Sequence, residues 1–277
     1  MAKGISIHIG LNRVDPNHYQ DAEGNPWDGA LQGCENDAKD MLAIAKKRGF
    51  APTLLLNDQA TSQAVVDVIS QAAKQLKKGD ILLLTYSGHG GQVPDRNKDE
   101  KDQMDETWCV YDRQIVDDEL YALWAKFKKG VRILMLSDSC HSGSVSRDPM
   151  FATILASANM RARLLPAGVQ ERTYKAHKKE YDQIQKDNPT GEKAAAKLGA
   201  TVVLLSGCQD NQFSSDGDRN GLFTATLLKV WSKGRFKGSL TRFHKGIKQQ
   251  MPLWQSPNYY VVGAANAAFE TQPPFSV

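Results

Sequence analysis

The sequence predicts an α/β fold with a mostly parallel central sheet of about six strands and helices on both faces. Three observations support this prediction. Short apolar runs with the length of buried strands recur along the chain. Segments with helical periodicity lie between these runs. The chain has 277 residues, which is long enough to bury one large core.

The elements follow in order from these patterns. The expected strands are residues 5–11, 53–56, 81–86, 131–136, 201–206 and 259–262. The expected helices are residues 35–48, 61–76, 117–127, 222–231 and 240–251. Each of the first two helices gathers apolar side chains on one face, for example Val65, Val68 and Ile69 in the second. We therefore expect one domain over residues 1–277.

Residues 146–197 interrupt this alternation. They are long, polar and basic, and the stretch from Arg161 to Leu198 carries nine Lys or Arg against five Asp or Glu. We interpret them as a segment inserted between two strands, part helix and part loop.

Composition excludes several classes of protein. The net charge is +4, and the 161–198 stretch alone supplies that excess, so we expect no nucleic-acid partner. The four cysteines are far apart in sequence, which favours a reducing compartment over a disulfide framework. No apolar run reaches the roughly 18 residues of a membrane helix, and the N-terminus does not resemble a signal peptide. We expect a soluble, cytoplasmic protein with no membrane partner.

Two predicted strands end in residues that suggest nucleophilic catalysis. The third leads into Ser87, Gly88, His89 and Gly90, and the fourth leads into Cys140. Carboxyl ends of parallel strands form the usual ligand site of such sheets. A neighbouring imidazole can activate a thiol and later protonate a leaving amine. Each residue alone would more often be structural, but together they predict Cys140 as nucleophile and His89 as its base.

Backbone donors are expected beside this pair. The N–H groups of Gly90 and Cys140 are candidates for an oxyanion hole. His141 is adjacent to the nucleophile, but neighbours on an extended segment point to opposite sides, so it is not the expected base. No orienting carboxylate is evident, and no glycine-rich nucleotide loop follows the first strand.

These motifs resemble a known family. YSGHG at 86–90 with DSCHSG at 138–143 is similar to the paired signature of metacaspases and their bacterial relatives, the orthocaspases, in the caspase clan of cysteine peptidases. His89 and Cys140 lie 51 positions apart, near the spacing of caspases. Further similarity lies in LQGCENDA at 31–38, IVDD at 115–118, LLSGCQDNQFSSD at 204–216 and GLFT at 221–224. True caspases have QAC followed by Gly at the nucleophile, so DSCHSG does not favour cleavage after aspartate.

The resemblance implies a substrate pocket and a reaction. By motif position, Cys34, Asp37, Ser87 and Asp138 line the pocket for the residue before the scissile bond. Two carboxylates converging on one pocket would select Arg or Lys in protein or peptide substrates. The chemistry needs no cofactor. We also expect self-processing within residues 146–197, with Arg161, Arg163, Arg172 and Lys175 as candidate sites.

Calcium is a further implication, as an activator. Motif position places three ligands of a metacaspase calcium site at Asp105, Asp117 and Asp118, while the fourth position holds Arg147. An EF-hand over residues 95–106 is not expected, because Glu100 occupies the place that needs glycine.

Two alternative functions stay open at this point. One is a catalytically silent scaffold with the same fold, which the intact His89 and Cys140 disfavour. The other is a different peptidase of the clan, legumain-like or gingipain-like, which the 31–38 and 115–118 segments disfavour.

Overall fold

A six-stranded sheet forms the centre of the computed structural model, which describes residues 2–98, 102–140, 160–188, 197–208, 212 and 214–277. The strand order is β11-β9-β7-β3-β1-β2, and every neighbouring pair is parallel except β11 with β9. The strands are β1 (Gly4–Gly10), β2 (Ala51–Leu56), β3 (Ile81–Ser87), β7 (Arg132–Asp138), β9 (Thr201–Ser206) and β11 (Asn258–Gly263). The predicted fold class is confirmed.

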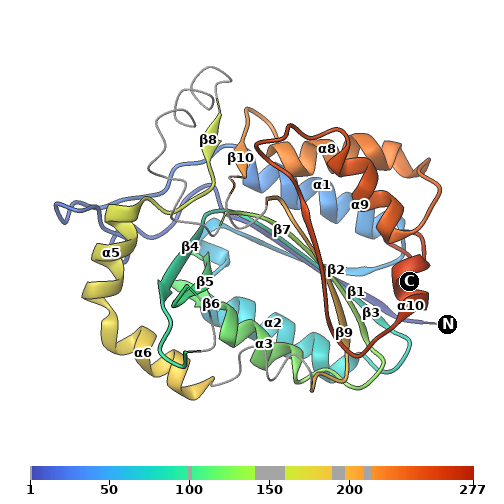
Figure 1. Ribbon diagram of the computed structural model, residues 1–277, viewed down its shortest axis with the longest axis horizontal. Helices are drawn as coiled ribbons and strands as arrows, with labels where there is room; N and C mark the ends of the chain where they lie inside the picture. Colours follow the sequence, from blue (N-terminus) through green and yellow to red (C-terminus); the bar gives the residue numbers. More distant parts are fainter. Residues whose placement is uncertain (1, 99–101, 141–159, 189–196, 209–211, 213) are drawn as a thin grey trace.

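Helices cover both faces of the sheet (Figure 1). One face carries α1 (Cys34–Lys47), α8 (Leu222–Trp231), α9 (Leu240–Lys248) and α10 (Ala267–Thr271). The other carries α2 (Ser62–Gln75) and α3 (Asp117–Trp124). Side chains alternate along β3, so Leu82 and Leu84 pack toward α2 and α3, while Ile81 and Leu83 pack toward α1 and α8. Each face therefore has its own apolar layer.

Local signals set several helix ends. The hydroxyl of Thr61 accepts a hydrogen bond from the Ala64 N–H and caps α2, and Ser239 caps α9 in the same way through Arg242. The apolar periodicity extends past the observed ends of two helices: α3 stops at Trp124 and α9 at Lys248, three residues before the expected ends in each case.

A second, antiparallel sheet was not predicted. It consists of β4 (Gly90–Pro94), β5 (Met104–Cys109) and β6 (Gln114–Val116) and follows directly on the tip of β3. Its strands are short and mix polar with apolar residues, so their periodicity is weak. Elsewhere in the chain, the short 3-10 helices η1 (Asn57–Gln59) and η3 (Ser232–Gly234) follow β2 and α8.

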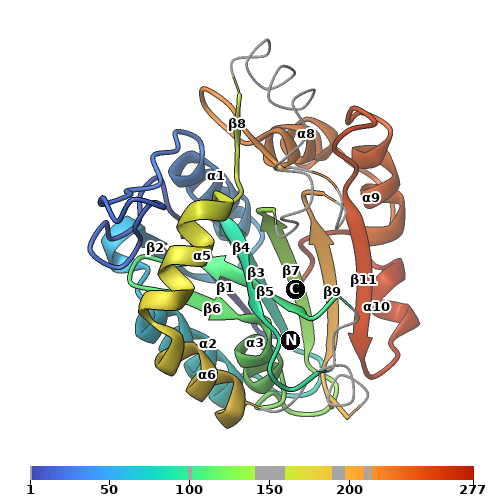
Figure 2. The same cartoon turned by 60° about the vertical axis from the view of Figure 1, so that its left-hand side comes forward.

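The inserted segment is packed onto the molecule. It contains β8 (Arg161–Ala162), α5 (Ala167–Ala176) and α6 (Lys178–Asp187), and β8 pairs with β10 (Ser215–Asp216). Figure 2 shows α5 and α6 passing beside the β4–β5–β6 sheet. Residues 141–159 and 189–196 of this region, including His141 and Arg147, lie outside the described residues. Of the helices in the described ranges, none is long and apolar enough to span a membrane.

A buried histidine in β1 makes the fold sensitive to acid. His8 is fully buried, its Nδ1 lies 2.9 Å from the Thr85 hydroxyl, and burial lowers its pKa to about 3. The unfolded chain therefore takes up a proton near pH 6.5 that the folded chain does not. The contribution of His8 to the free energy of unfolding is therefore fully present above this pH. It falls by up to about 1.4 kcal/mol per pH unit as the pH drops toward 3.

We predict that His8→Asn will reduce this pH dependence. Denaturant unfolding between pH 7 and pH 4 measures it, with the Cys140→Ala protein as background so that the chain stays intact. The slope of unfolding free energy against pH should be shallower in the variant. Equal slopes would show that His8 does not control acid stability.

Candidate active site

The register of the central sheet brings the two predicted catalytic residues together. Ser87 at the end of β3 pairs with Asp138 at the end of β7. His89 and Cys140 each follow by two residues, so they leave the sheet side by side at its carboxyl edge. Both side chains are buried. Both residues therefore lie just beyond adjacent strand tips, as predicted, and their roles as base and nucleophile stay a prediction.

A backbone carbonyl orients His89. Its Nε2 lies 3.0 Å from the Gly29 oxygen, and a carbonyl only accepts, so Nε2 carries the proton. Nδ1 is buried without a hydrogen bond of ordinary geometry among the described residues, although the Leu164 backbone is close enough to act on the ring. Its lone pair is therefore available as a base. Burial lowers the pKa of His89 to about 4, so the ring is neutral at neutral pH. The Gly29 carbonyl takes the orienting place for which the sequence offered no carboxylate.

Gly29 is required where it stands. Its φ is +62°, and a Cβ there would approach the Trp27 ring to 2.9 Å. Trp27 in turn packs on the His89 ring, with centroids 5.0 Å apart. The segment between β1 and α1 thus supports the imidazole through both a carbonyl and an aromatic face.

The predicted oxyanion donors converge on one atom. The N–H of Gly90 and the N–H of Cys140 both donate to the carbonyl oxygen of Arg163, at 3.0 and 3.1 Å. The Cys140 sulfur lies against the Ser214 backbone, 3.3 Å from its carbonyl oxygen. A carbonyl from the chain itself therefore occupies the position that these donors would offer to a substrate.

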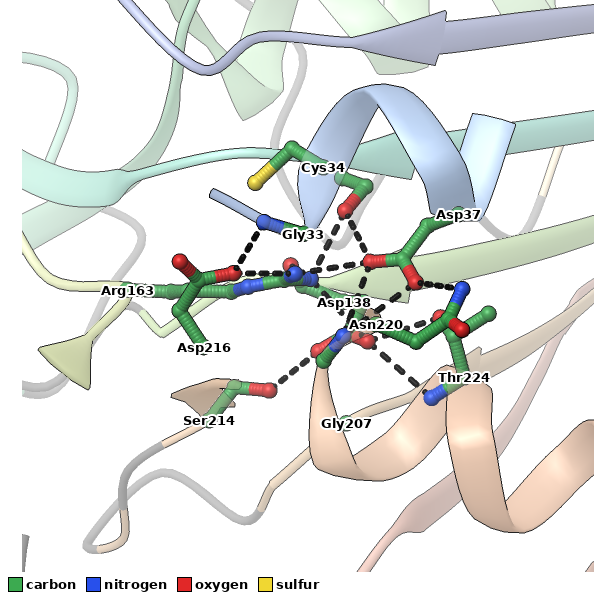
Figure 3. A network of polar contacts seen from close by, with 12 residues as sticks. Gly33, Cys34, Asp37, Asp138, Arg163, Gly207, Ser214, Asp216, Asn220 and Thr224 are labelled. Carbon is green, nitrogen blue, oxygen red and sulfur yellow. Dashed lines mark hydrogen bonds and ion pairs between the residues drawn. The ribbon is translucent and has the colours of Figure 1, made fainter. Parts of the chain in front are cut away.

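The side chain of Arg163 fills an acidic pocket (Figure 3). It is fully buried. Nη2 contacts Asp37 at 2.7 Å and Asp216 at 2.8 Å, and Nη1 contacts Asp138 at 3.0 Å and the Ser87 hydroxyl at 2.7 Å. Three predicted pocket residues, Asp37, Ser87 and Asp138, thus surround one guanidinium.

The pocket carboxylates are held by hydrogen bonds from several elements. The Asn220 amide and the Gly221 N–H donate to Asp37. Thr224 donates to Asp138 from both its N–H and its hydroxyl, and the Ser214 hydroxyl donates to the same carboxylate. These bonds satisfy oxygens that would otherwise be costly to bury.

Burial and the neighbouring charges act in opposite directions on the pKa values of the pocket residues. Burial, opposed by Arg163 but reinforced by Asp138, raises the pKa of Asp37 to about 6. The carboxylates raise the pKa of Arg163 well above its usual value even though burial acts the other way. Cys34, the fourth predicted pocket residue, is a buried thiol whose pKa is raised by burial. It is therefore a neutral wall near Ser87, with which it shares a hydrogen bond.

The chain around Arg163 lies extended in the site. Arg161 and Ala162 form β8 against β10, and the Arg163 N–H donates to the Ser214 oxygen at 2.9 Å. Beyond it, the Leu165 N–H donates to the Gly90 oxygen at 2.7 Å. Backbone hydrogen bonds on both sides, the carbonyl between two donors and the side chain in the acidic pocket together describe a bound peptide strand.

Sequence reasoning missed several residues of this site. Asp216 and Ser214 belong to the 204–216 motif, which was matched as a whole without assigning roles to its members. Gly29 acts through its carbonyl, and such a contact leaves no mark in residue type. Arg163 was one of four candidate cleavage sites, and nothing in the sequence indicated that its side chain is fully buried.

The predicted calcium ligands lie in β5 and at the start of α3. Asp117 and Asp118 begin α3, the Oδ2 of Asp118 accepts from the Asn97 amide, and Asp105 is buried in β5 opposite Val93. Their oxygens suit a hard cation. They are not among the described clusters of three ligand groups within 4.8 Å of one another, and Arg147 lies outside the described residues. Calcium here stays a prediction.

Comparison with known proteins agrees with this site. A family model of the caspase domain, Peptidase_C14, matches residues 14–268. The chain belongs to the caspase-domain family. The resemblance to metacaspases is confirmed, because Metacaspase-1 of Kluyveromyces lactis is 30% identical over 239 residues, covering 73% of this chain and 55% of that protein. The chain therefore spans about half the length of this curated relative.

Solved structures show the same caspase fold. Protein GSU0716 from Geobacter sulfurreducens is 50% identical, with a TM-score of 0.87 and 99% of both chains covered. Caspase-1 from Spodoptera frugiperda is 12% identical with a TM-score of 0.54, covering 95% of this chain and 89% of that one, which shows likeness of fold alone.

A glycine beside the pocket provides a test of how Arg163 is held. Gly221 has φ −62°, which alanine accepts, but a Cβ there would lie 2.5 Å from the Arg163 Cζ. We predict that Gly221→Ala expels the side chain from the pocket. In a Cys140→Ala background, trypsin should then cut after Arg163 at least about tenfold faster, because the bond becomes accessible. Mass spectrometry measures the rate of this cut. Equal rates with and without Gly221→Ala would contradict the prediction.

Proposed function

We propose that this chain is a cysteine endopeptidase that cleaves after Arg or Lys, and that its first substrate is its own Arg163–Leu164 bond. The observation that carries the proposal is the placement of Arg163. Its carbonyl oxygen accepts from Gly90 and Cys140, and its guanidinium lies between Asp37, Asp138 and Asp216. Membership of the caspase-domain family supports the reaction class.

The proposed reaction uses the groups at the strand tips. Cys140 transfers its thiol proton to His89 Nδ1 and attacks the Arg163 carbonyl carbon. The oxygen becomes an oxyanion held by the N–H groups of Gly90 and Cys140. His89 then gives the proton to the nitrogen of Leu164, and the C–N bond breaks. Water hydrolyses the thioester, with His89 again as base. The Gly29 carbonyl keeps Nε2 protonated throughout.

The same placement implies that the enzyme is inhibited before cleavage. While Arg163 fills the pocket, no other Arg or Lys side chain can enter it. A substrate from another protein would need residues 161–165 to leave the site. The proposed enzyme is thus inhibited by its own cleavage segment until that segment is cut or displaced.

The proposal predicts self-cleavage at one particular bond of the inserted segment. Purified wild-type protein should yield a new N-terminus at Leu164, whereas Cys140→Ala and His89→Ala should stay intact. Arg163→Ala should also block the cut, because alanine leaves the carboxylates unpaired, and Arg163→Lys should retain a slower one. Arg161→Ala is the matched control, since Arg161 is exposed and bonds only the Ala30 oxygen among described contacts. Identical intact masses for wild type and Cys140→Ala would refute self-cleavage, and retained turnover of peptides by Cys140→Ala would refute the mechanism.

Substrate preference forms a second prediction. Fluorogenic peptides that differ only in the residue before the scissile bond should be cleaved when that residue is Arg or Lys and not when it is Asp. The reason is that the three pocket carboxylates repel an anionic side chain. Asp37→Asn, Asp138→Asn or Asp216→Asn should each lower kcat/KM by about a hundredfold or more. The exposed Asp67→Asn is the control. Cleavage of Arg peptides should also fall below about pH 6, where Asp37 is protonated. A panel without charge dependence would refute the pocket assignment, and a protein that never cleaves would favour a silent scaffold.

Calcium activation is proposed from the resemblance and tested separately. Millimolar calcium should raise the melting temperature of Cys140→Ala, because an ion bound only by the folded state stabilises it. Asp118→Asn should abolish the rise. No shift on adding calcium or a chelator would remove calcium from this proposal and leave the peptidase proposal untouched.

A further inference from the structure

A second cluster of ligating side chains lies away from the active site. His18 belongs to the segment between β1 and α1, His177 lies between α5 and α6, and Glu180 is in the first turn of α6. One nitrogen or carboxylate oxygen from each lies within 4.8 Å of the others. Within the described ranges, this is the single group of three or more His, Cys, Asp or Glu that meets the criterion. Neither the resemblance nor the proposed reaction gives it a role.

The two imidazoles are arranged face to face. Their centroids are 3.9 Å apart and their planes are 16° from parallel. Nδ1 of His177 lies 3.8 Å from Oε2 of Glu180. That pair is partly exposed, and an ion pair of this length and exposure contributes little to stability. The contact between these side chains therefore does not by itself explain why the three are gathered.

A buried tyrosine fixes the orientation of His18. Nε2 of His18 lies 2.9 Å from the Tyr181 hydroxyl, and that oxygen accepts from the Gln114 N–H at 3.1 Å. Tyr181 is fully buried, so the ring it holds is well positioned. Histidines that bind metal commonly have their second nitrogen fixed in this way, and in the tautomer whose Nε2 donates to this hydroxyl, Nδ1 can bind a cation.

The surrounding charges are mixed. Asp15 and Asp112 act on His18 as anions and Arg113 as a cation, and Nε of Arg113 is 4.0 Å from Oε1 of Glu180. Burial, followed by His177, lowers the pKa of His18 to about 4.

We propose that His18, His177 and Glu180 form a zinc-binding site. Two imidazoles and one carboxylate are a donor set that zinc accepts, with water as a fourth ligand at this partly exposed position. Tetrahedral zinc at 2.0–2.2 Å from each ligand needs ligand atoms about 3.4 Å apart. Zinc binding would require Glu180 and His177 to rotate toward His18, because the two imidazole rings stand nearly parallel.

Zinc at this position would join two segments that flank the catalytic centre. The segment with His18 also carries Gly29, whose carbonyl orients His89. The α5–α6 pair with His177 and Glu180 follows directly on residues 161–165. The ion would tie one segment to the other and stabilise the folded state by mass action. The site does not depend on the proposed peptidase function.

Zinc affinity tests the proposal directly. Cys140→Ala serves as the parent protein, because the thiol of Cys140 could itself bind zinc and obscure the measurement. Competition with a chromogenic chelator should give one zinc per chain for the parent. Adding His177→Ala should weaken binding at least about tenfold, and adding Glu180→Gln should weaken it by a smaller factor. Adding His244→Ala is the matched control, since this half-buried histidine bonds the Pro257 oxygen far from the cluster in sequence.

Thermal stability provides an independent readout. Zinc should raise the melting temperature of the parent and of the His244→Ala protein, and not that of the His177→Ala protein. The melting temperatures without zinc show whether each variant is folded. If the His177→Ala protein is unfolded, the comparison is made with Glu180→Gln instead. Equal zinc affinity in the parent and in the folded cluster variants would overturn the site, as would a parent that binds no zinc.

Discussion

The burial of one guanidinium among three carboxylates is the interaction on which the rest of the site depends. Arg163 is fully buried, and Asp37, Asp138 and Asp216 approach it from α1, β7 and β10. Removing one partner of a buried ion pair typically costs about 3–5 kcal/mol, because the remaining charge is left without compensation. The cluster therefore holds three elements and the inserted segment in one arrangement.

The parallel register of β3 and β7 is the second constraint. Because Ser87 pairs with Asp138, the residues two positions beyond them meet at the sheet edge. The same register brings the N–H groups of Gly90 and Cys140 to one oxygen. A slip of one residue would send the side chains of His89 and Cys140 to opposite faces. The geometry of the proposed dyad is thus a consequence of strand pairing more than of loop conformation.

Much of the fold could be predicted because its elements are strongly periodic. Residues 201–206 and 222–231 were expected as strand and helix with the bounds that β9 and α8 have. The β4–β5–β6 sheet was missed, since short strands with polar residues leave no clear period. Within the site, His89 and Cys140 could be predicted because chemistry restricts which residue types serve, and Asp37 and Asp138 because their motif positions match the family that the sequence resembles. Gly29 could not, because a carbonyl acceptor is present in every residue.

The sequence by itself determined the fold class, the strand tips and the residue types gathered there, since these depend on local pattern and on side-chain chemistry. Only the tertiary structure decided which basic residue of the inserted segment enters the pocket. Arg161, Arg163, Arg172 and Lys175 are equivalent as sequence, but β8 pairs with β10 in a register that aims Arg163 alone at the carboxylates. The same holds for His18 and His177, which are 159 positions apart and meet only because α5 and α6 fold back beside the segment after β1. Long-range pairing fixes such contacts, and no local pattern encodes them.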